Sequence, residues 1–579
     1  MDVRSDGEKC DFVVIASSRV VRDLSQMRGA TGVLRRTTFM VRSATFTLLA
    51  GLTAVLFPFV PGFPYRLEQY DLPKEVSLGI LGTVAAFHCL VSRDADREDR
   101  IGRSLAAFLG WGLLAVPLVS DNSVASWRTM GVFAAAAAVF LLARIAGRIG
   151  ASPVAFQGTL AIIGLMCALV LLEAYGGIPF VSAPGRRPGA MLGNRNLAAR
   201  LACMVLPLVW VHLVGARRRV ARYLLFAALL GAAAVIVVSR SRGAMLAALG
   251  LSFVLPVISR WSRPVGTHPW RAAILTWIAG LMLGGAAAAI LPNRLEWGLS
   301  DFVSSASRVA EYQRGTGRGR VIQAATTWRM IREHALSGVG PGNWSLTYPA
   351  FALPDDPSVA LGAFYPGPQT PRNDVLAIVA EWGILGTSLG LVFLVVLGRR
   401  AVALLLCGVE GAGLSGVLLI GVVLAAAMLG LFDSVLRVAP TVMLLATLAG
   451  LSMGHGEDVA GLVPPCALRN PRILSAAAWV VVALLSASFA HGAALDLRAL
   501  RIITTYASIK DLAQAVRIAP NNVEARALLS YVLVSVDRCD LARPHMNRGA
   551  QLQPHSHFFR FLQTRCARHP HPGDTGLRR

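Results

Sequence analysis

The chain has 579 residues, of which 55% are hydrophobic and only 15% are charged, and its formal net charge is +24. Soluble proteins carry about 25% charged residues, so this composition excludes an ordinary soluble protein. The positive charge comes almost entirely from arginine, since only Lys9, Lys74 and Lys510 are lysines. The arginines lie in short segments between apolar runs and not on one polar domain, which argues against nucleic-acid binding.

Apolar runs follow one another along the chain, and each is long enough to cross a ~30 Å hydrocarbon core as a helix. We count about thirteen, at 44–61, 76–92, 104–119, 130–147, 154–174, 197–214, 221–238, 244–259, 274–291, 375–397, 411–432, 437–453 and 473–491. The sequence therefore predicts an all-α, polytopic membrane protein of about 12–13 transmembrane helices with one large polar loop and a small helical tail.

Arginine-rich segments alternate with the apolar runs. If the N-terminus lies in the cytoplasm, every even-numbered connection through the first ten runs is basic, as the positive-inside rule describes. The same phase places the long polar insertion, 292–374, outside the cytoplasm, together with the connections 175–196 and 239–243. A thirteenth run would place the C-terminal segment on that outer side as well. Residues 1–41 show no apolar core of a cleavable signal peptide, so we expect the first run to direct membrane insertion.

These patterns divide the chain into five expected parts. They are a basic cytoplasmic tail (1–41), an N-terminal transmembrane bundle (42–291), a polar loop (292–374), C-terminal transmembrane helices (375–491) and a helical tail (492–579).

The helical tail contains a short internal repeat. Segment 515–520 returns as segment 549–554, at a spacing of about 34 residues that resembles the tetratricopeptide repeat. An amphipathic helical tail with chance periodicity is the alternative, because about three repeats are usually needed for a stable solenoid. Cys539 and Cys566 both lie in this tail, and a disulfide between them is possible on the outer, oxidising side of the membrane.

Two polar motifs stand at the outer ends of apolar runs. In the first, Asn194 and Asn196 can cap a helix start, and Arg195 lies between them. A helix N-terminus with flanking arginine is suited to bind an anion, although a plain helix cap explains the same residues. In the second, Arg240 and Arg242 share a short turn between two runs. Two arginines at such a place are costly unless they face a cavity or a counter-ion, and guanidinium groups pair well with phosphate; interfacial snorkelling is the alternative.

The third polar motif is the long loop itself. Arg320 stands at the start of an expected helical stretch over 321–334, and the segment 338–343 is a glycine-rich turn. Glycine readily adopts the backbone conformations that such a turn requires. Asn373 and Asp374 then begin the next apolar run.

Taken together, these segments resemble the O-antigen ligase/polymerase superfamily. Arg320 lies eighteen residues before Gly338-Val339-Gly340-Pro341-Gly342-Asn343-Trp344, which is followed by Asn373-Asp374-Val375-Leu376 and Glu381-Trp382-Gly383-Ile384-Leu385-Gly386. The segments 193–198 and 241–244 resemble the two earlier motifs of that family, in the family's order. The similarity covers roughly residues 150–455.

The resemblance implies a glycosyltransferase of the bacterial inner membrane that moves a glycan from undecaprenyl diphosphate to an acceptor hydroxyl on the periplasmic face. A lipid A–core acceptor would make it a ligase, a growing glycan a polymerase, and a protein serine or threonine an oligosaccharyltransferase. The diphosphate already activates the donor, so the resemblance implies no cofactor and no metal. Its arginines would neutralise the departing diphosphate.

The resemblance also assigns roles to individual residues. The candidate catalytic residues are Arg242, Arg320, Asp374 and Arg372. The candidate substrate-binding residues are Asn194, Arg195, Asn196, Arg240, Gly340, Gly342, Asn343 and Asn373. Membrane lipids and a protein partner of the helical tail are further expected partners.

At one position the chain departs from the family. Its ligases usually carry a histidine directly before the Asn-Asp pair, where it would deprotonate the acceptor hydroxyl, and this chain has Arg372 there. Arginine stays protonated in proteins and cannot act as that base. Asp374 or Glu381 can take its place, or Arg372 can bind a phosphate. Two other classes stay open: a transporter of a lipid-linked glycan, and a non-catalytic membrane scaffold.

Overall fold

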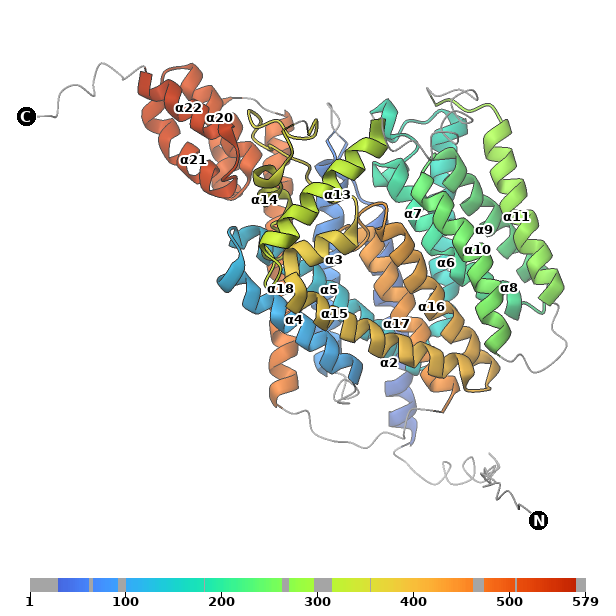
Figure 1. Cartoon of the computed structure of the whole chain (residues 1–579). Coiled ribbons are helices and arrows are strands. Elements are labelled where there is room, and N and C mark those ends of the chain that lie inside the picture. The colour runs from blue at the N-terminus through green and yellow to red at the C-terminus, as the bar shows by residue number, and fades with distance from the viewer. Residues whose placement is uncertain are drawn as a thin grey trace, which may run out of the picture.

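The computed structural model describes residues 30–61, 66–91, 100–181, 183–262, 270–295, 315–354, 356–461, 473–505 and 508–568. Every secondary-structure element in these ranges is a helix, which confirms the predicted all-α class. The helices form one bundle, and a smaller C-terminal group of helices lies beside it (Figure 1). Most of the expected N-terminal tail, 1–41, and residues 296–314 of the expected loop lie outside the described residues.

The predicted apolar runs form the helices of the bundle. These are α2 (Ala30–Leu56), α3 (Glu68–Val91), α4 (Arg100–Val119), α5 (Ser123–Arg148), α6 (Ser152–Leu171), α7 (Arg195–Met204), α8 (Leu206–Gly215), α9 (Arg219–Val238), α10 (Arg242–Ser259), α11 (Trp270–Ile290), α15 (Asp374–Leu406), α16 (Glu410–Gly430), α17 (Ala439–Val459) and α18 (Ile473–Thr505).

Eleven helices in the described ranges are long and apolar enough to cross a membrane, with α7 and α8 forming one of them, which confirms a polytopic membrane protein. The other two predicted runs also form helices. The first lies in α2, whose apolar part, Met40–Leu56, is shorter than the eleven, and the run 437–453 lies in α17.

Small residues let the central helices approach one another closely. A Cβ at Gly450 of α17 would lie 2.3 Å from the carbonyl oxygen of Phe140 in α5, and a Cβ at Gly454 would lie 2.0 Å from that of Arg144. Such contacts are typical of membrane helices, whose association depends on packing because lipid supplies no hydrophobic driving force between them. Glycine at these two positions therefore permits the α5–α17 contact at the centre of the bundle.

One end of the bundle, which we call the loop end, gathers the connections 120–122, 172–194, 239–241 and 431–438 and the loop 315–373. Hydrogen bonds join these segments: Arg294 N donates to Ala174 O at 2.9 Å, and Asn122 N donates to Asn343 Oδ1 at 3.0 Å. Near the opposite end, the buried Glu457 pairs with arginines of α5 and α15 at 2.7–3.0 Å. The loops predicted to share one side of the membrane thus lie together, while the side itself stays a prediction.

The loop has a small hydrophobic core of its own. Its helices α13 (Gly315–Glu333) and α14 (Trp344–Phe351) pack against each other and the start of α15, and α13 crosses the upper part of the bundle in Figure 1. Trp344 and Tyr348 are fully buried in this core, where Trp344 Nε1 donates to Thr327 Oγ1 at 3.0 Å. Burial and the hydrogen bond to Asp356 both raise the pKa of Tyr348, so its hydroxyl stays a neutral donor.

Four short helices form the C-terminal tail: α19 (Ile509–Ile518), α20 (Val523–Ser535), α21 (Cys539–Leu552) and α22 (His557–Arg568). Each packs on the next, and a disulfide joins Cys539 to Cys566, as the sequence allowed. The long helix α18 continues through the expected boundary at 491/492 and leads into the tail. The tetratricopeptide resemblance of the tail stays a prediction.

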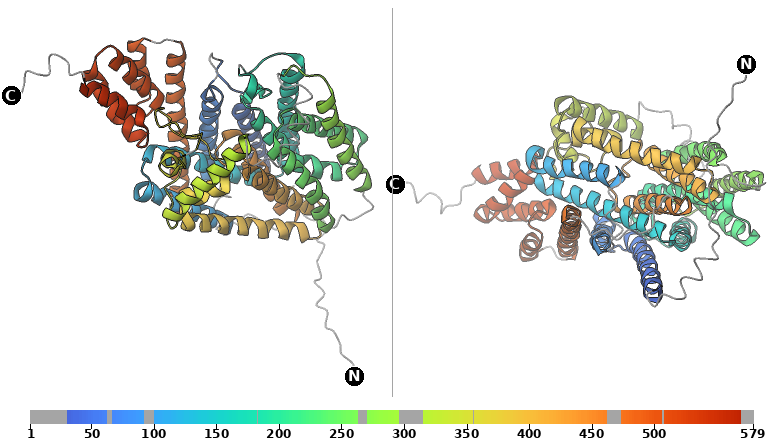
Figure 2. Two further views of the ribbon diagram at one scale, coloured as in Figure 1. Left: turned by 45° about the horizontal axis from the view of Figure 1, so that its top comes forward. Right: turned by 90° about the horizontal axis from the view of Figure 1, so that it is seen from below.

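The tail lies beside the bundle (Figure 2) and is hydrogen-bonded to the loop. Ser556 Oγ donates to Ala363 O at 2.7 Å, and His557 N donates to Leu361 O at 2.8 Å. Arg66 forms an ion pair with Glu524 of α20. The tail and the loop therefore lie on the same side of the bundle.

Candidate functional site

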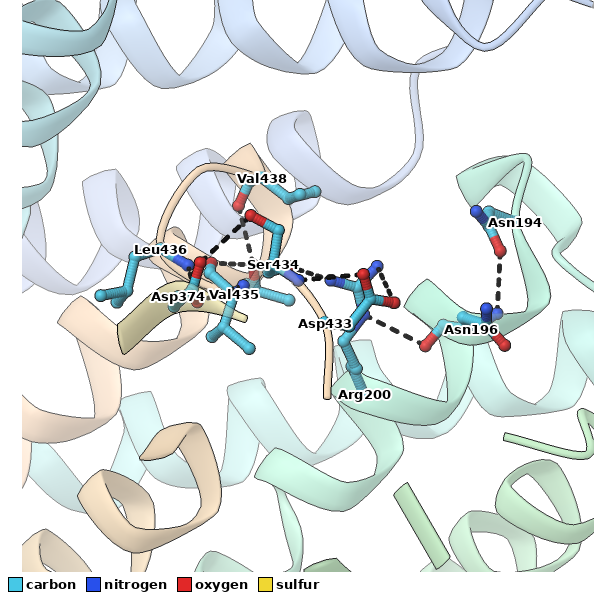
Figure 3. Close-up of polar contacts among 10 residues, drawn as sticks. Asn194, Asn196, Arg200, Asp374, Asp433, Ser434, Val435, Leu436 and Val438 are labelled. Carbon is cyan, nitrogen blue, oxygen red and sulfur yellow. Dashed lines mark hydrogen bonds and ion pairs between the residues drawn. The ribbon is translucent and has the colours of Figure 1, made fainter. Parts of the chain in front are cut away.

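The segment 431–438 between α16 and α17 connects four of the motif segments that the sequence singles out. Figure 3 shows its middle residues held between the start of α15 and the first turns of α7. Each motif reaches this segment by a different contact.

The Asn-Asp motif binds the segment most closely. Asp374, the first residue of α15, is buried; its Oδ2 accepts hydrogen bonds from Val435 N at 2.6 Å and Leu436 N at 3.0 Å, and its Oδ1 accepts one from Ser434 Oγ at 3.2 Å (Figure 3). Asn373 caps α15 by accepting from Leu376 N at 3.0 Å, and its Nδ2 donates to Leu431 O at 3.3 Å. These contacts give both residues a structural role.

The Asn194–Asn196 motif reaches the segment through Arg200. Asn194 caps α7, since its Oδ1 accepts from Asn196 N at 3.0 Å. One turn later, the buried Arg200 donates through Nε to Asn196 O at 3.3 Å and through a terminal nitrogen to Ser434 O, and it lies 3.7 Å from Asp433 (Figure 3). The start of α7 is thereby fixed against the segment 431–438.

The other two motifs touch the ends of the segment. Gly243, next to Arg242 at the start of α10, packs on Phe432, because a Cβ there would lie 2.8 Å from Phe432 Cβ. At the far end, Arg437 forms an ion pair with Glu381 of α15 at 2.6 Å. Four motifs that are spread over the sequence thus meet at one short connection.

The glycine-rich turn and the Glu-Trp-Gly motif form a single structural unit. Gly383 interrupts α15 with φ +62°, and the backbone carbonyls of Ala380 and Glu381 accept from Val339 N at 2.9 Å and Gly340 N at 3.0 Å. The fully buried Glu381 side chain accepts from Gly342 N at 2.8 Å and from Trp344 N at 3.0 Å. Glu381 therefore holds the turn from inside the protein.

Asn343 connects this turn to α5. It is fully buried, its Oδ1 accepts from Asn122 N at 3.0 Å, and its Nδ2 donates to Ser126 Oγ at 2.8 Å. Asn122 also donates through Nδ2 to Leu552 O of the tail at 3.1 Å. Turn, bundle and tail are thus joined through two asparagines. The predicted substrate-binding role of Asn343 stays a prediction.

Replacement of Gly340 by alanine is expected to lower the free energy of unfolding by at least about 2 kcal/mol. Its φ is +91°, and a Cβ would lie 2.2 Å from Ser120 Oγ and 2.8 Å from Ser120 Cα. Thermal unfolding of the detergent-solubilised protein measures the effect, with Gly319→Ala as control, since a Cβ at Gly319 meets no atom within 4 Å. Equal melting temperatures for the two variants would contradict the packing role of Gly340; its binding role, like that of Gly342, stays a prediction.

Arginines from three segments come together at the loop end. Arg195 is the first residue of α7, and Arg240 and the exposed Arg186 lie close enough to act on its charge. The segment that carries Arg186 is held by the buried Glu173, whose two carboxylate oxygens accept from four backbone N–H groups, those of Phe180, Val181, Gly189 and Ala190, at 2.6–3.1 Å. Arginines from three segments are therefore gathered at this end of the bundle.

Arg242 and Arg320 belong to neighbouring parts of the same end. Arg242 begins α10, two residues after Arg240, which has φ +52°. Arg320 lies on α13, one turn before Gln323, whose Oε1 accepts from Arg372 N at 3.0 Å. The side chain of Arg372 is exposed. α13 thus brings Arg320 toward the beginning of α15, where the Asn-Asp motif lies.

Among the described residues of this end, the buried Lys74, Glu173 and Arg200 and the half-buried Arg437 carry no role in the sequence-based prediction. Lys74 is fully buried in α3 and donates to the carbonyl oxygens of Pro58, Tyr70 and Met191 at 2.6–2.8 Å. The sequence did contain a signal for these residues, because each is a charged residue within or beside an apolar run. Such charges are costly in a membrane and indicate a specific partner.

The chemistry that the described residues offer at this site is that of arginines and helix N-termini. Such groups bind oxyanions. Within the described ranges, no group of three or more His, Cys, Asp or Glu side chains is arranged to hold a metal ion.

Comparison with known families agrees with this chemistry. Residues 227–391 match a family model described as O-antigen ligase. The match includes Arg242, Arg320, the glycine-rich turn and the motifs at the start of α15, whereas the Asn194–Asn196 motif precedes it. No curated protein matches the chain. The match confirms the resemblance of these motifs to the O-antigen ligase superfamily: the chain is a multi-pass membrane protein whose residues 227–391 match that family.

Proposed function

We propose that this protein transfers a glycan from undecaprenyl diphosphate to an acceptor hydroxyl at the loop end, on the periplasmic face of the inner membrane. The observation that supports this proposal is the meeting of four motif segments at 431–438, which gathers arginines of α7, α10 and the 239–241 turn at one end. A charged, water-facing end of an otherwise apolar bundle suits a substrate with a lipid tail and a diphosphate head.

In the proposed reaction, the acceptor oxygen attacks the anomeric carbon, and the bond from that carbon to the diphosphate oxygen breaks. Negative charge grows on the departing diphosphate, and Arg242 and Arg320 stabilise it, with Arg195 and Arg240 adding to the positive field. The exposed Arg372 adds a further positive charge at the start of α15. Arginine groups fixed before the reaction act without reorganisation, which is the source of their effect.

The hydroxyl proton needs an acceptor, and the carboxylates nearby are already engaged. Asp374 accepts three hydrogen bonds, and Glu381 accepts two and pairs with Arg437. Carboxylate oxygens that already accept these hydrogen bonds are held toward their donors and not toward an acceptor hydroxyl. We therefore assign both residues a positioning role. We propose that the terminal phosphate of the released diphosphate, which is basic near neutral pH, accepts the hydroxyl proton.

Deletion of the gene, followed by analysis of surface glycans and lipid-linked intermediates, tests this function. Accumulation of full-length lipid-linked glycan indicates ligation to lipid A–core, and accumulation of single repeat units indicates polymerisation. Loss of glycan from a membrane or secreted protein indicates an oligosaccharyltransferase. Intermediates confined to the cytoplasmic leaflet would point to a transporter instead, and unchanged glycans and intermediates to a scaffold.

A further inference from the structure

Two arginines of the tail lie close together at its α20–α21 contact. Arg526 of α20 donates through Nε to Pro520 O at 2.6 Å, and its NH1 lies 3.3 Å from His545 Nδ1 of α21. Arg548, one turn after His545, donates to Asn521 Oδ1 at 2.8 Å and to Gln551 Oε1 at 3.1 Å. We call Arg526, His545 and Arg548 the tail cluster.

The tail cluster differs in its partners from Arg66 and Arg538. Arg66 and Arg538 pair with carboxylates, those of Glu524 and Asp540. The partners of the tail cluster are all neutral, and none of its members forms an ion pair within the described ranges. Burial and the neighbouring Arg548 both lower the pKa of Arg526, and burial and Arg526 lower that of His545. Two like charges are therefore held side by side by neutral groups.

Such an arrangement costs free energy in the unliganded protein, because like charges repel and partial burial removes water from them. It also fixes the guanidinium groups before any ligand binds, which reduces the entropy lost on binding. Planar guanidinium groups match the oxygens of phosphate and carboxylate in geometry as well as charge. The cluster therefore has the properties of an oxyanion site.

The position of the cluster relates it to the loop end. Arg548 lies one helical turn before Leu552, whose carbonyl oxygen accepts from Asn122 Nδ2. Asn521, which binds Arg548, precedes Asn522, whose Nδ2 donates to Asp496 of α18 at 3.0 Å. The cluster therefore lies on the part of the tail that touches the bundle, about 6 Å along α21 from the contact with Asn122.

We propose that the tail cluster binds the phosphate or carboxylate groups of an anionic saccharide. The site is separate from the arginines at the loop end; the choice of a saccharide as its ligand rests on the proposed function. An acidic or phosphorylated sugar bound there would be held by the tail beside the loop end.

Direct binding to the full-length protein in detergent tests this proposal without measuring activity. The probes are a short oligogalacturonate and a glucose oligosaccharide carrying one phosphate, with the neutral glucose oligosaccharide as reference. The Arg526→Ala/Arg548→Ala variant is expected to bind at least one charged probe about tenfold more weakly than the wild type. The arginines of the loop end are intact in this variant, so the change isolates the tail.

A matched control removes the same charge elsewhere on the tail. Arg517 and Arg543 are exposed and belong to α19 and α21, and the Arg517→Ala/Arg543→Ala variant is expected to bind both probes like the wild type. If both double-alanine variants lost the same affinity for the charged probes, the effect would come from the overall charge of the tail, and the proposed site would be overturned. A wild type that binds the charged and neutral probes equally would also overturn it. An Arg526→Lys/Arg548→Lys variant keeps the charge without the planar group and controls for folding. Its affinity for the charged probes is expected to fall between those of the wild type and the Arg526→Ala/Arg548→Ala variant. The probe that the wild type binds more tightly shows whether the site prefers phosphate or carboxylate.

Discussion

Replacement of Arg242 by alanine is expected to reduce the rate of glycan transfer by about 100-fold or more, with little effect on folding. Arg242 begins α10 at the loop end, and the adjacent Gly243 packs on Phe432 of the connection where the motifs meet. A fixed charge that acts on the departing diphosphate stabilises the transition state more than the bound donor. The variant should therefore lower kcat and kcat/KM together.

Arg219 offers a matched control for this prediction. It is also the first residue of its helix, α9, but the chain crosses the bundle between Arg219 and Arg242, so it lies at the opposite end. Its side chain is exposed, and Arg219→Ala should transfer glycan at the wild-type rate. For Arg320→Ala, which is expected to lose activity to a similar extent, the control is Arg332→Ala on the same helix, α13. Transfer at the wild-type rate by the Arg242 and Arg320 variants would refute the proposed diphosphate contacts.

The fold class could be predicted from the sequence because hydrophobic length determines it. An apolar run of about 20 residues has one favourable state in a membrane, an α-helix that satisfies its own backbone hydrogen bonds. The interruption of α15 at Gly383 could not be predicted in this way. It exists because the distant residues Val339 and Gly340 donate to the helix carbonyls, and only the folded chain brings them there.

Parts of the candidate site could be predicted where a residue type favours one structural role, such as helix capping or a tight turn. Asn194 and Asn373 cap helices as their position before an apolar run suggests, and the turn glycines adopt positive φ angles. The segment 431–438 escaped prediction, because its importance arises from residues such as Asp374 and Arg200 that bind it from elsewhere in the chain. Its own sequence reads as an ordinary short connection.

The two acidic residues considered as the base show the limit of reasoning from type and position alone. Until its partners are known, a carboxylate near a predicted site fits a catalytic role as well as a structural one. The structure shows Asp374 and Glu381 buried and bound by several donors. Their partners therefore indicate positioning, which the stability of variants can distinguish from catalysis.

Replacement of Glu381 by alanine is expected to lower the free energy of unfolding by about 3–5 kcal/mol. The change removes a fully buried carboxylate and leaves Arg437 and the N–H groups of Gly342 and Trp344 without their acceptor. Glu381→Gln keeps one acceptor oxygen but turns an amide group toward other donors, so an intermediate loss of about 1–3 kcal/mol is expected. Thermal unfolding in detergent, followed by tryptophan fluorescence, measures both losses.

A double-mutant cycle separates the ion pair from the turn. Adding Arg437→Met to Glu381→Ala removes the uncompensated charge, so the double variant should be more stable than the sum of the single losses predicts. Glu333→Ala, at the exposed end of α13, serves as the control and should unfold with the wild type. If Glu381→Ala were as stable as this control yet inactive, the carboxylate would not be holding the turn, and a direct part in proton transfer would become the better assignment.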